Sequence, residues 1–162
     1  MATRFSDDDI DSMLHEPKLL PAKYSARIQL RDKRGHKERE LEVDGAQGNK
    51  YRLILRLNTI NSLDFSIILA YLSSDTNQLF RLRRYNGKSH EHTNHIEGNS
   101  FYDFHIHQAT ERYQDLGGRE DSYAEPTDRF ADYHTALQCL LDDCEFEPPE
   151  GSQQTLFGEF DL

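Results

Sequence analysis

The feature that most constrains this fold is a two-residue alternation of apolar and polar side chains that recurs along the chain. Residues 51–57 and 65–72 have an apolar side chain at every second position, and Phe80 and Leu82 show the same spacing within residues 79–85. This period is typical of strands that place one face on a core. Turn sequences such as Asn86-Gly87 separate the segments. Closely spaced strands joined by short turns predict an antiparallel sheet, either an open meander or a partly closed barrel.

About six strands and two helices are expected. The strand pattern occurs at residues 24–31, 38–43, 51–57, 65–72, 79–85 and 101–107. Ser6 is expected to cap a short N-terminal helix, and an apolar stripe from Phe130 to Leu141 predicts a C-terminal helix that packs on the sheet. We therefore expect one α+β domain over residues 1–147, followed by a flexible linker and a disordered tail over residues 148–162.

Composition narrows the class of protein. No apolar run approaches the roughly 18 residues that a membrane span needs, and the N-terminal residues lack the apolar core of a secretory signal, so a cytoplasmic protein is expected. Cys139 and Cys144 are the only cysteines, and their spacing indicates neither a disulfide nor a redox motif. The formal net charge of −10 argues against a protein that coats nucleic acid over its whole surface.

The arginines of the central strands suggest a binding surface. If the alternation continues from strand to strand, five arginines share one sheet face with His105 and His107. These arginines are Arg27, Arg52, Arg56, Arg81 and Arg83. Guanidinium groups bind phosphate oxygens in pairs, so such a face is suited to nucleic acid or to a phosphate ligand. In the alternative interpretation, the acidic residues of the same face neutralise the arginines across the strands. These are Glu38, Glu40, Glu42, Asp64 and Asp103.

The histidines suggest a second kind of site. His105 and His107 lie two apart on a predicted strand, and His90 and His92 lie in the connection before it. Imidazoles bind transition metals and also act as acids and bases near neutral pH. The spacing of His90, His92 and Glu97 resembles the first half of a cupin metal motif, without the later proline-glycine-histidine half. We expect no cofactor, with a divalent transition metal at these four histidines as the alternative.

The C-terminal tail contains the sharpest short motif. The segment from Gln153 to Phe160 resembles the peptide by which replication and repair proteins dock on sliding clamps. The residues that carry the resemblance are Gln153, Thr155, Leu156, Phe157 and Phe160. Such a tail folds on binding, when its apolar side chains fill a pocket of the partner. Glu159 departs from the motif, which has an aromatic residue there. The alternative is that the tail packs on its own domain.

The central region from Phe80 to Gln114 is similar to a family of small uncharacterised prokaryotic proteins, a resemblance that implies no activity. The sequence leaves open whether the chain is an enzyme. It favours an accessory protein of DNA transactions that binds nucleic acid on the arginine face and docks on a clamp through its tail. The alternatives are a metal-dependent or histidine-dependent hydrolase of nucleotides or nucleic acid, and a protein-interaction module such as an antitoxin, immunity or anti-defence factor.

Overall fold

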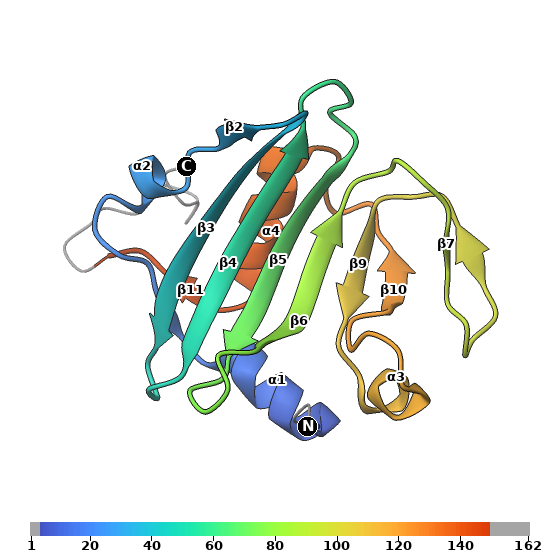
Figure 1. The fold of residues 1–162 in the computed structure, drawn as a ribbon, viewed down its shortest axis with the longest axis horizontal. Helices are drawn as coiled ribbons and strands as arrows, with labels where there is room; N and C mark the ends of the chain where they lie inside the picture. Colours follow the sequence, from blue (N-terminus) through green and yellow to red (C-terminus); the bar gives the residue numbers. More distant parts are fainter. Residues whose placement is uncertain (1–3, 150–162) are drawn as a thin grey trace.

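The computed structural model describes residues 4–149 as four helices and eleven strands (Figure 1). The helices are α1 (Asp7–His15), α2 (Tyr24–Arg27), α3 (Glu111–Leu116) and α4 (Tyr133–Asp143). The strands are β1 (Lys18–Leu19), β2 (Arg31–Lys33), β3 (His36–Gly45), β4 (Lys50–Asn58), β5 (Phe65–Leu72), β6 (Leu79–Asn86), β7 (His92–Thr93), β8 (Ser100–Phe101), β9 (His105–Gln108), β10 (Tyr123–Pro126) and β11 (Phe146–Glu147).

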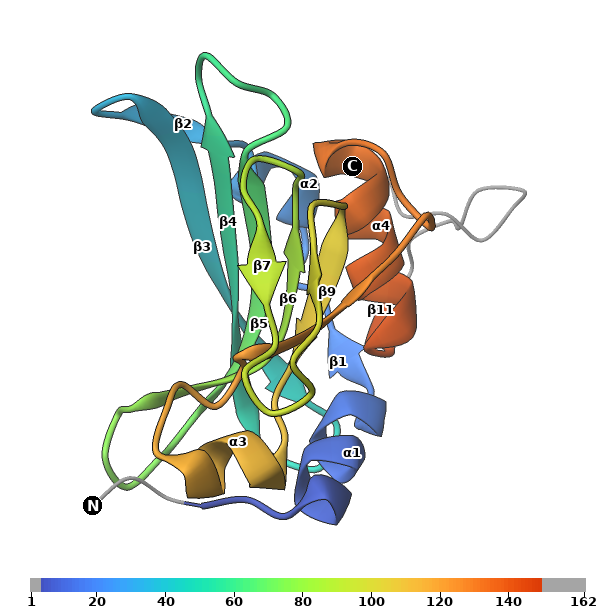
Figure 2. The same cartoon turned by 90° about the vertical axis from the view of Figure 1, so that its right-hand side faces the viewer.

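Nine strands form one strongly curled sheet that resembles half a barrel (Figures 1 and 2). Their order is β10-β9-β6-β5-β4-β3-β1-β11, and β2 pairs with the start of β3, on the edge that β1 occupies near the end of that strand. All pairs are antiparallel except β1 with β11. The predicted α+β class and antiparallel sheet are confirmed. The strand count exceeds six because several edge strands have only two to four residues, too few to show a period.

Two predicted strands are wrong in detail. Residues 24–27 form the single helical turn α2, and the chain becomes extended only at β2. The segment 101–107 is divided between β8 and β9, which pair with different partners. A short alternating pattern is weak evidence for a strand, because tertiary contacts decide the structure of such a segment.

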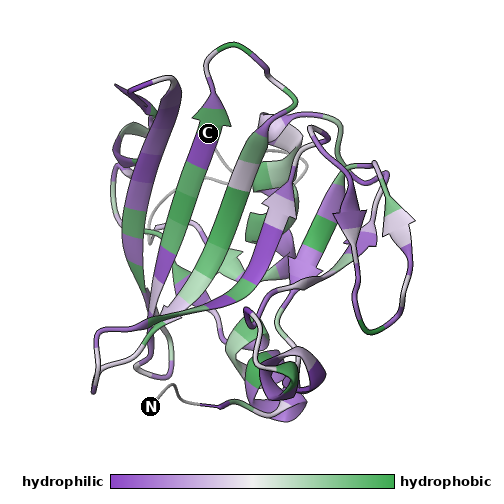
Figure 3. Ribbon diagram, turned by 45° about the vertical axis from the view of Figure 1, so that its right-hand side comes forward, coloured by the Kyte–Doolittle hydropathy of each residue, from purple (hydrophilic) through white to green (hydrophobic). Residues whose placement is uncertain are grey.

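The core lies between α4 and one face of the sheet. Leu53, Leu55, Ile67 and Leu69 of the central strands are fully buried there. Figure 2 shows α4 on this side of the sheet, and Figure 3 shows the apolar banding of β4 and β5. Asp132 begins α4 with a capping box, and the helix turns its buried leucines toward the strands. We call the sheet face under α4 the inner face and the opposite face the outer face.

A buried lysine joins two helix ends below the core. Lys18 is fully buried, and its Nζ donates to the carbonyl oxygens of Met13, Leu14 and Glu16, at the end of α1, and of Cys144, at the end of α4, over 2.8–3.1 Å. The C-terminal end of a helix carries partial negative charge and free carbonyl groups, so one ammonium group, which shares its three N–H bonds among four carbonyl oxygens, stabilises both ends.

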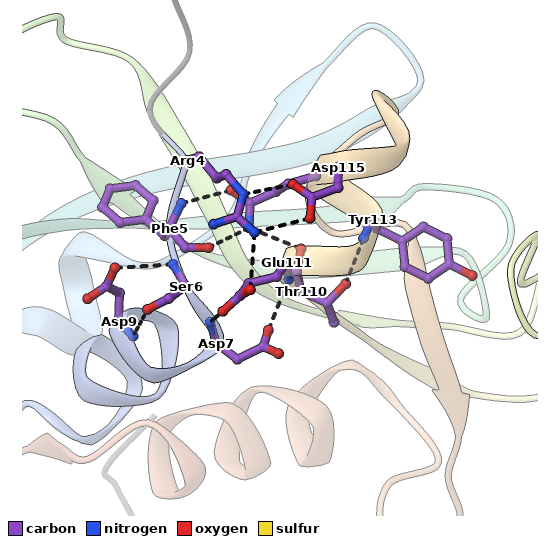
Figure 4. A network of polar contacts seen from close by, with 10 residues as sticks. Arg4, Phe5, Ser6, Asp7, Asp9, Thr110, Glu111, Tyr113 and Asp115 are labelled. Carbon is purple, nitrogen blue, oxygen red and sulfur yellow. Dashed lines mark hydrogen bonds and ion pairs between the residues drawn. The ribbon is translucent and has the colours of Figure 1, made fainter.

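The N-terminal helix is tied to α3 through polar contacts (Figure 4). Asp7 and Glu111, at the first turns of α1 and α3, each accept the backbone N–H of the other. Arg4 adds ion pairs of 3.1 Å to Glu111 and 2.7 Å to Asp115. Each helix start is therefore capped by an acidic side chain of the other helix, which closes the lower end of the sheet. Within residues 4–149, no helix has the length and apolar character needed to cross a membrane.

Candidate functional site

A β-bulge in β6 decides which arginines share a face. The register between β5 and β6 shifts between Leu69 and Ala70, so Arg81 lies opposite Ala70 while Arg83 lies opposite Leu69. Because a shift of one residue exchanges the two faces of a strand, Arg83 points to the inner face. The prediction that Arg81 and Arg83 share a face is therefore wrong. Arg84 takes the outer position instead, directly opposite His107 of β9.

The other three predicted arginines of the sheet face, and Arg81, differ in their positions and in their ion-pair partners. Arg27 lies on α2 and not on the sheet, which corrects its predicted position. Arg52 and Arg56 lie on the outer face of β4, where Arg52 forms a 2.8 Å ion pair with Glu42. Arg81 pairs with Glu120 at 2.6 Å.

Two arginines of the outer face, Arg52 and Arg81, therefore form ion pairs with acidic neighbours. Arg56 is exposed and lies opposite Glu38 in the register of β3 and β4. Arg27 and Arg83 are therefore not part of the outer face, on which the sequence predicted a continuous phosphate-binding surface.

Four histidines gather at the other end of the outer face, and we call them the histidine cluster: His90, His92, His105 and His107. His105 and His107 point outward from β9. The flap, residues 87–104, contains β7 and β8 and places His90 and His92 over them. Ring centroids are 4.9 Å apart for His105 and His107, 4.8 Å for His92 and His107, and 6.3 Å for His90 and His105. Two segments separate in sequence thus bring four imidazoles together.

Hydrogen bonds to carbonyl oxygens fix the tautomers of the two strand histidines. His105 Nδ1 lies 2.7 Å from the carbonyl oxygen of Asp103, and His107 Nδ1 lies 2.8 Å from that of Asp121. A carbonyl oxygen can only accept, so Nδ1 is the protonated nitrogen of each ring and Nε2 keeps its lone pair. Burial lowers the pKa of His105 to about 4, and burial together with the charge of Arg84 lowers the pKa of His107 to about 2. Both rings are neutral at neutral pH.

The flap histidine is positioned by a buried amide. Asn94 is almost fully buried and pairs with the backbone of Ala124 in β10, donating through Nδ2 over 2.8 Å and accepting at Oδ1 over 2.9 Å. This pairing fixes the orientation of the amide. His92 Nε2 lies 2.8 Å from Asn94 Oδ1, so this nitrogen donates and Nδ1 of His92 keeps its lone pair.

An open pocket of about 400 Å³ lies beside the cluster, lined by His90, His92, His107 and Arg84 among others. Arg84 faces the fully buried carboxylate of Asp121 at 3.2 Å, so its charge is largely compensated. Within residues 4–149, no three His, Cys, Asp or Glu side chains are arranged to hold a metal ion as they stand. The site therefore presents neutral imidazole nitrogens beside a paired guanidinium group.

A basic segment, residues 23–39, was missed by the sequence analysis. It comprises α2, β2 and the start of β3, with seven cationic and two acidic side chains in a chain of net charge −10. The cationic residues are Lys23, Arg27, Arg31, Lys33, Arg34, Lys37 and Arg39. All but Arg39 are exposed. The signal in the sequence is the positive charge of residues 31–37, which join the predicted strands 24–31 and 38–43.

The hairpin that carries this segment is tight. Arg34 and Gly35 both have positive φ, 38° and 89°, as a two-residue type I′ turn requires. Within the described residues, Lys33 pairs with Glu38 at 2.7 Å, and the side chains of Arg31, Arg34 and Lys37 have no ion-pair partner. Figure 2 shows the β2–β3 hairpin on the side of the sheet away from α4, and Figure 3 shows its hydrophilic character.

The predicted clamp-binding residues, from Gln153 to Phe160, lie outside the described residues. Among comparisons with known proteins, residues 5–146 match the model of a family described as of unknown function, DUF6978. The prediction of an uncharacterised family is confirmed, and the match extends well beyond the central region on which the resemblance depended. No curated protein and no solved structure gives a match.

Proposed function

Since the chain belongs to DUF6978, a family of unknown function, we propose a function from its geometry: the chain binds nucleic acid through the basic segment. The observation that carries this proposal is the presence of three exposed cations without an ion-pair partner among the described residues, Arg31, Arg34 and Lys37, on one hairpin of an otherwise acidic protein. Arg31, Arg34 and Lys37 are the residues expected to contact phosphates, and Arg56 lies across β3 from Arg31, in register with Glu38.

The shape of the segment suits this role. A two-stranded ribbon fits the major groove of duplex DNA, and phosphate contacts position such a ribbon without reading sequence. The acidic surface elsewhere repels the phosphate backbone, so it restricts binding to the hairpin end of the molecule. This relocates the predicted phosphate surface from the centre of the sheet to its β2–β3 edge.

Fluorescence anisotropy with labelled duplex DNA, single-stranded DNA and RNA tests the proposal. The triple variant Arg31→Gln, Arg34→Gln, Lys37→Gln should weaken binding by at least ~10-fold at low salt, because each lost phosphate contact also removes counterion release. The matched control carries the same charge change at three exposed cations elsewhere: Lys50→Gln, Lys88→Gln and Arg119→Gln. Equal weakening in both variants would show that only net charge matters, and would contradict the proposal.

The tail supports a second part of the proposal, docking on a sliding clamp. The support is the residue pattern of Gln153, Thr155, Leu156, Phe157 and Phe160 alone. Calorimetry with a purified clamp from the same organism should detect binding by the full chain, and the substitution of Leu156 and Phe157 by alanine should abolish it. Unchanged binding by this variant would refute the docking role and leave nucleic-acid binding by the hairpin untouched.

A hydrolase of nucleotides or nucleic acid is the second candidate function. The observation that favours it is the gathering of four imidazoles beside Arg84, since histidines can divide the acid and base roles in phosphodiester cleavage. Release of phosphate or of cleaved product from a panel of nucleotides and oligonucleotides should be detected, and should be lost in His107→Ala. A panel with no turnover above the buffer blank would exclude this candidate for those substrates.

A further inference from the structure

We propose that the histidine cluster is a binding site for one divalent transition metal ion of the zinc type, held by His105 and His107 of β9 and by His92 of the flap. This proposal does not depend on nucleic-acid binding, which is assigned to the opposite end of the sheet. The three ligands from the protein are imidazole nitrogens, and imidazole donors suit zinc, copper, nickel or cobalt better than magnesium or calcium.

The spacing of the rings matches one shared ion. His105 and His107 lie on the same face of one strand, two residues apart, so their side chains project in parallel. Two imidazoles bound to one tetrahedral zinc through Zn–N bonds of about 2.0–2.1 Å have ring centroids about 5 Å apart. The observed centroid distances are 4.9 Å between His105 and His107 and 4.8 Å between His92 and His107, and the third pair, His92 and His105, is wider at 5.6 Å.

Each of these rings keeps a lone pair for a ligand. The tautomers fixed by Asp103, Asp121 and Asn94 leave His105 Nε2, His107 Nε2 and His92 Nδ1 unprotonated. A metal-binding histidine commonly donates its other N–H to a backbone carbonyl or an amide, which orients the ring toward the ion. The supporting hydrogen bonds of a metal site are therefore already present around His105 and His107, whereas the His92 ring has to reorient when the ion binds.

One buried nitrogen of the histidine cluster lacks a hydrogen-bond partner among the described residues. His105 is fully buried, and its Nε2 has no hydrogen-bond partner among the described residues. A buried polar atom without a partner costs free energy, so it calls for a specific explanation. An ion bound at this lone pair provides one, because the carbonyl of Asp103 already occupies the other nitrogen.

Ion binding requires a local adjustment of the flap. The rings of His92 and His105 are nearly parallel, with an interplanar angle of 19°, so they do not yet aim at a common point. His92 lies on β7, which within residues 4–149 pairs only with β8, and the tip of the flap, residues 95–100, is exposed. Rotation of this ring completes a three-nitrogen site, and His90, at the exposed rim, or a water molecule fills the fourth position of a tetrahedral ion.

Titration with Co²⁺ tests the site through the visible absorption of the bound ion. The full-length protein, without a histidine tag and treated with chelator, should bind one Co²⁺ per chain, and Zn²⁺ should displace it. His105→Ala and His107→Ala should each weaken binding by at least ~100-fold, since even supporting residues contribute 10–100-fold to metal affinity. The control variants are His15→Ala and His134→Ala, which remove exposed histidines outside the cluster.

A third variant keeps the test valid if the buried substitutions prevent folding. His92→Ala changes a half-buried flap residue and should retain the circular dichroism spectrum of the fold while weakening Co²⁺ binding by at least ~10-fold. The proposal is overturned if the wild-type protein fails to bind Co²⁺ in molar excess of metal. It is also overturned if His92→Ala binds as tightly as His15→Ala.

Discussion

The substitution Lys18→Met tests how much the hydrogen bonds of Lys18 to the C-terminal ends of α1 and α4 stabilise the fold. The variant retains a chain of similar length between the rings of Tyr51 and Phe146, which lie 4.8 and 5.9 Å from Nζ. It removes the donor from four buried carbonyl oxygens and the positive charge from two helix C-termini. Each unsatisfied carbonyl costs about 1–3 kcal/mol, whereas the ammonium group no longer has to be desolvated.

The balance of these effects predicts a large loss of stability. Removing one partner from a buried charged contact typically costs about 3–5 kcal/mol, which is at least about a fifth of the roughly 5–15 kcal/mol that stabilises a small domain. Urea unfolding followed by circular dichroism measures the difference, with the exposed Lys88→Met as the control. A loss below about 1 kcal/mol would refute the interpretation that Lys18 holds the helix ends together.

The same residue predicts a pH dependence. Burial lowers the pKa of Lys18 to about 8, while the unfolded chain titrates near 10.4. Between these values the unfolded state binds more protons, so this residue makes the free energy of unfolding rise with pH by up to about 1 kcal/mol per unit. Burial also raises the pKa of the Cys144 thiol to about 12, which acts in the opposite direction in both proteins. The stability gap between wild type and Lys18→Met should therefore widen from pH 8 to 10, and a narrowing gap would contradict the assigned shift.

Two further predictions concern the room for a side chain at two glycines and the accessibility of the two cysteine thiols to reagents. Gly87→Ala should lower the melting temperature strongly, because a Cβ there would lie 1.9 Å from the carbonyl oxygen of Leu63, whereas Gly118→Ala meets nothing closer than 3.9 Å and should be nearly neutral in thermal unfolding. In the folded protein a thiol reagent should modify Cys139, which is half-buried, and leave Cys144, which is fully buried, until denaturant is added. Two reactive thiols without denaturant would contradict this burial.

The central strands could be predicted from the sequence because each has one face on the core. The period of residues 51–57 and 65–72 follows from that geometry, and so do β4 and β5. The bulge at Leu82 could not be predicted from the two-residue period. That period assumes that each residue of a strand pairs with one residue of its neighbour, whereas Leu82 is an extra residue. The adjacent Arg83 and Arg84 were the available signal, since on a regular strand one of them must face the core.

The histidine cluster and the basic segment show two other limits. The chemistry of His105 and His107 was visible in the sequence, but their contact with His92 depends on Asn94 pairing with Ala124, thirty residues away. Contacts of this kind arise from tertiary packing and leave no local pattern. The basic segment was visible as charge, but its significance depends on the exposed hairpin that carries Arg34 at its tip.

The most direct test of the central claim is the salt dependence of duplex DNA binding. The logarithm of the binding constant falls with the logarithm of salt concentration by about 0.9 for each phosphate neutralised. If Arg31, Arg34 and Lys37 each contact one phosphate, the triple glutamine variant should have a slope smaller than that of the wild type by about 3. Equal slopes in the two proteins, or no salt-dependent binding by the wild type, would contradict nucleic-acid binding by the hairpin.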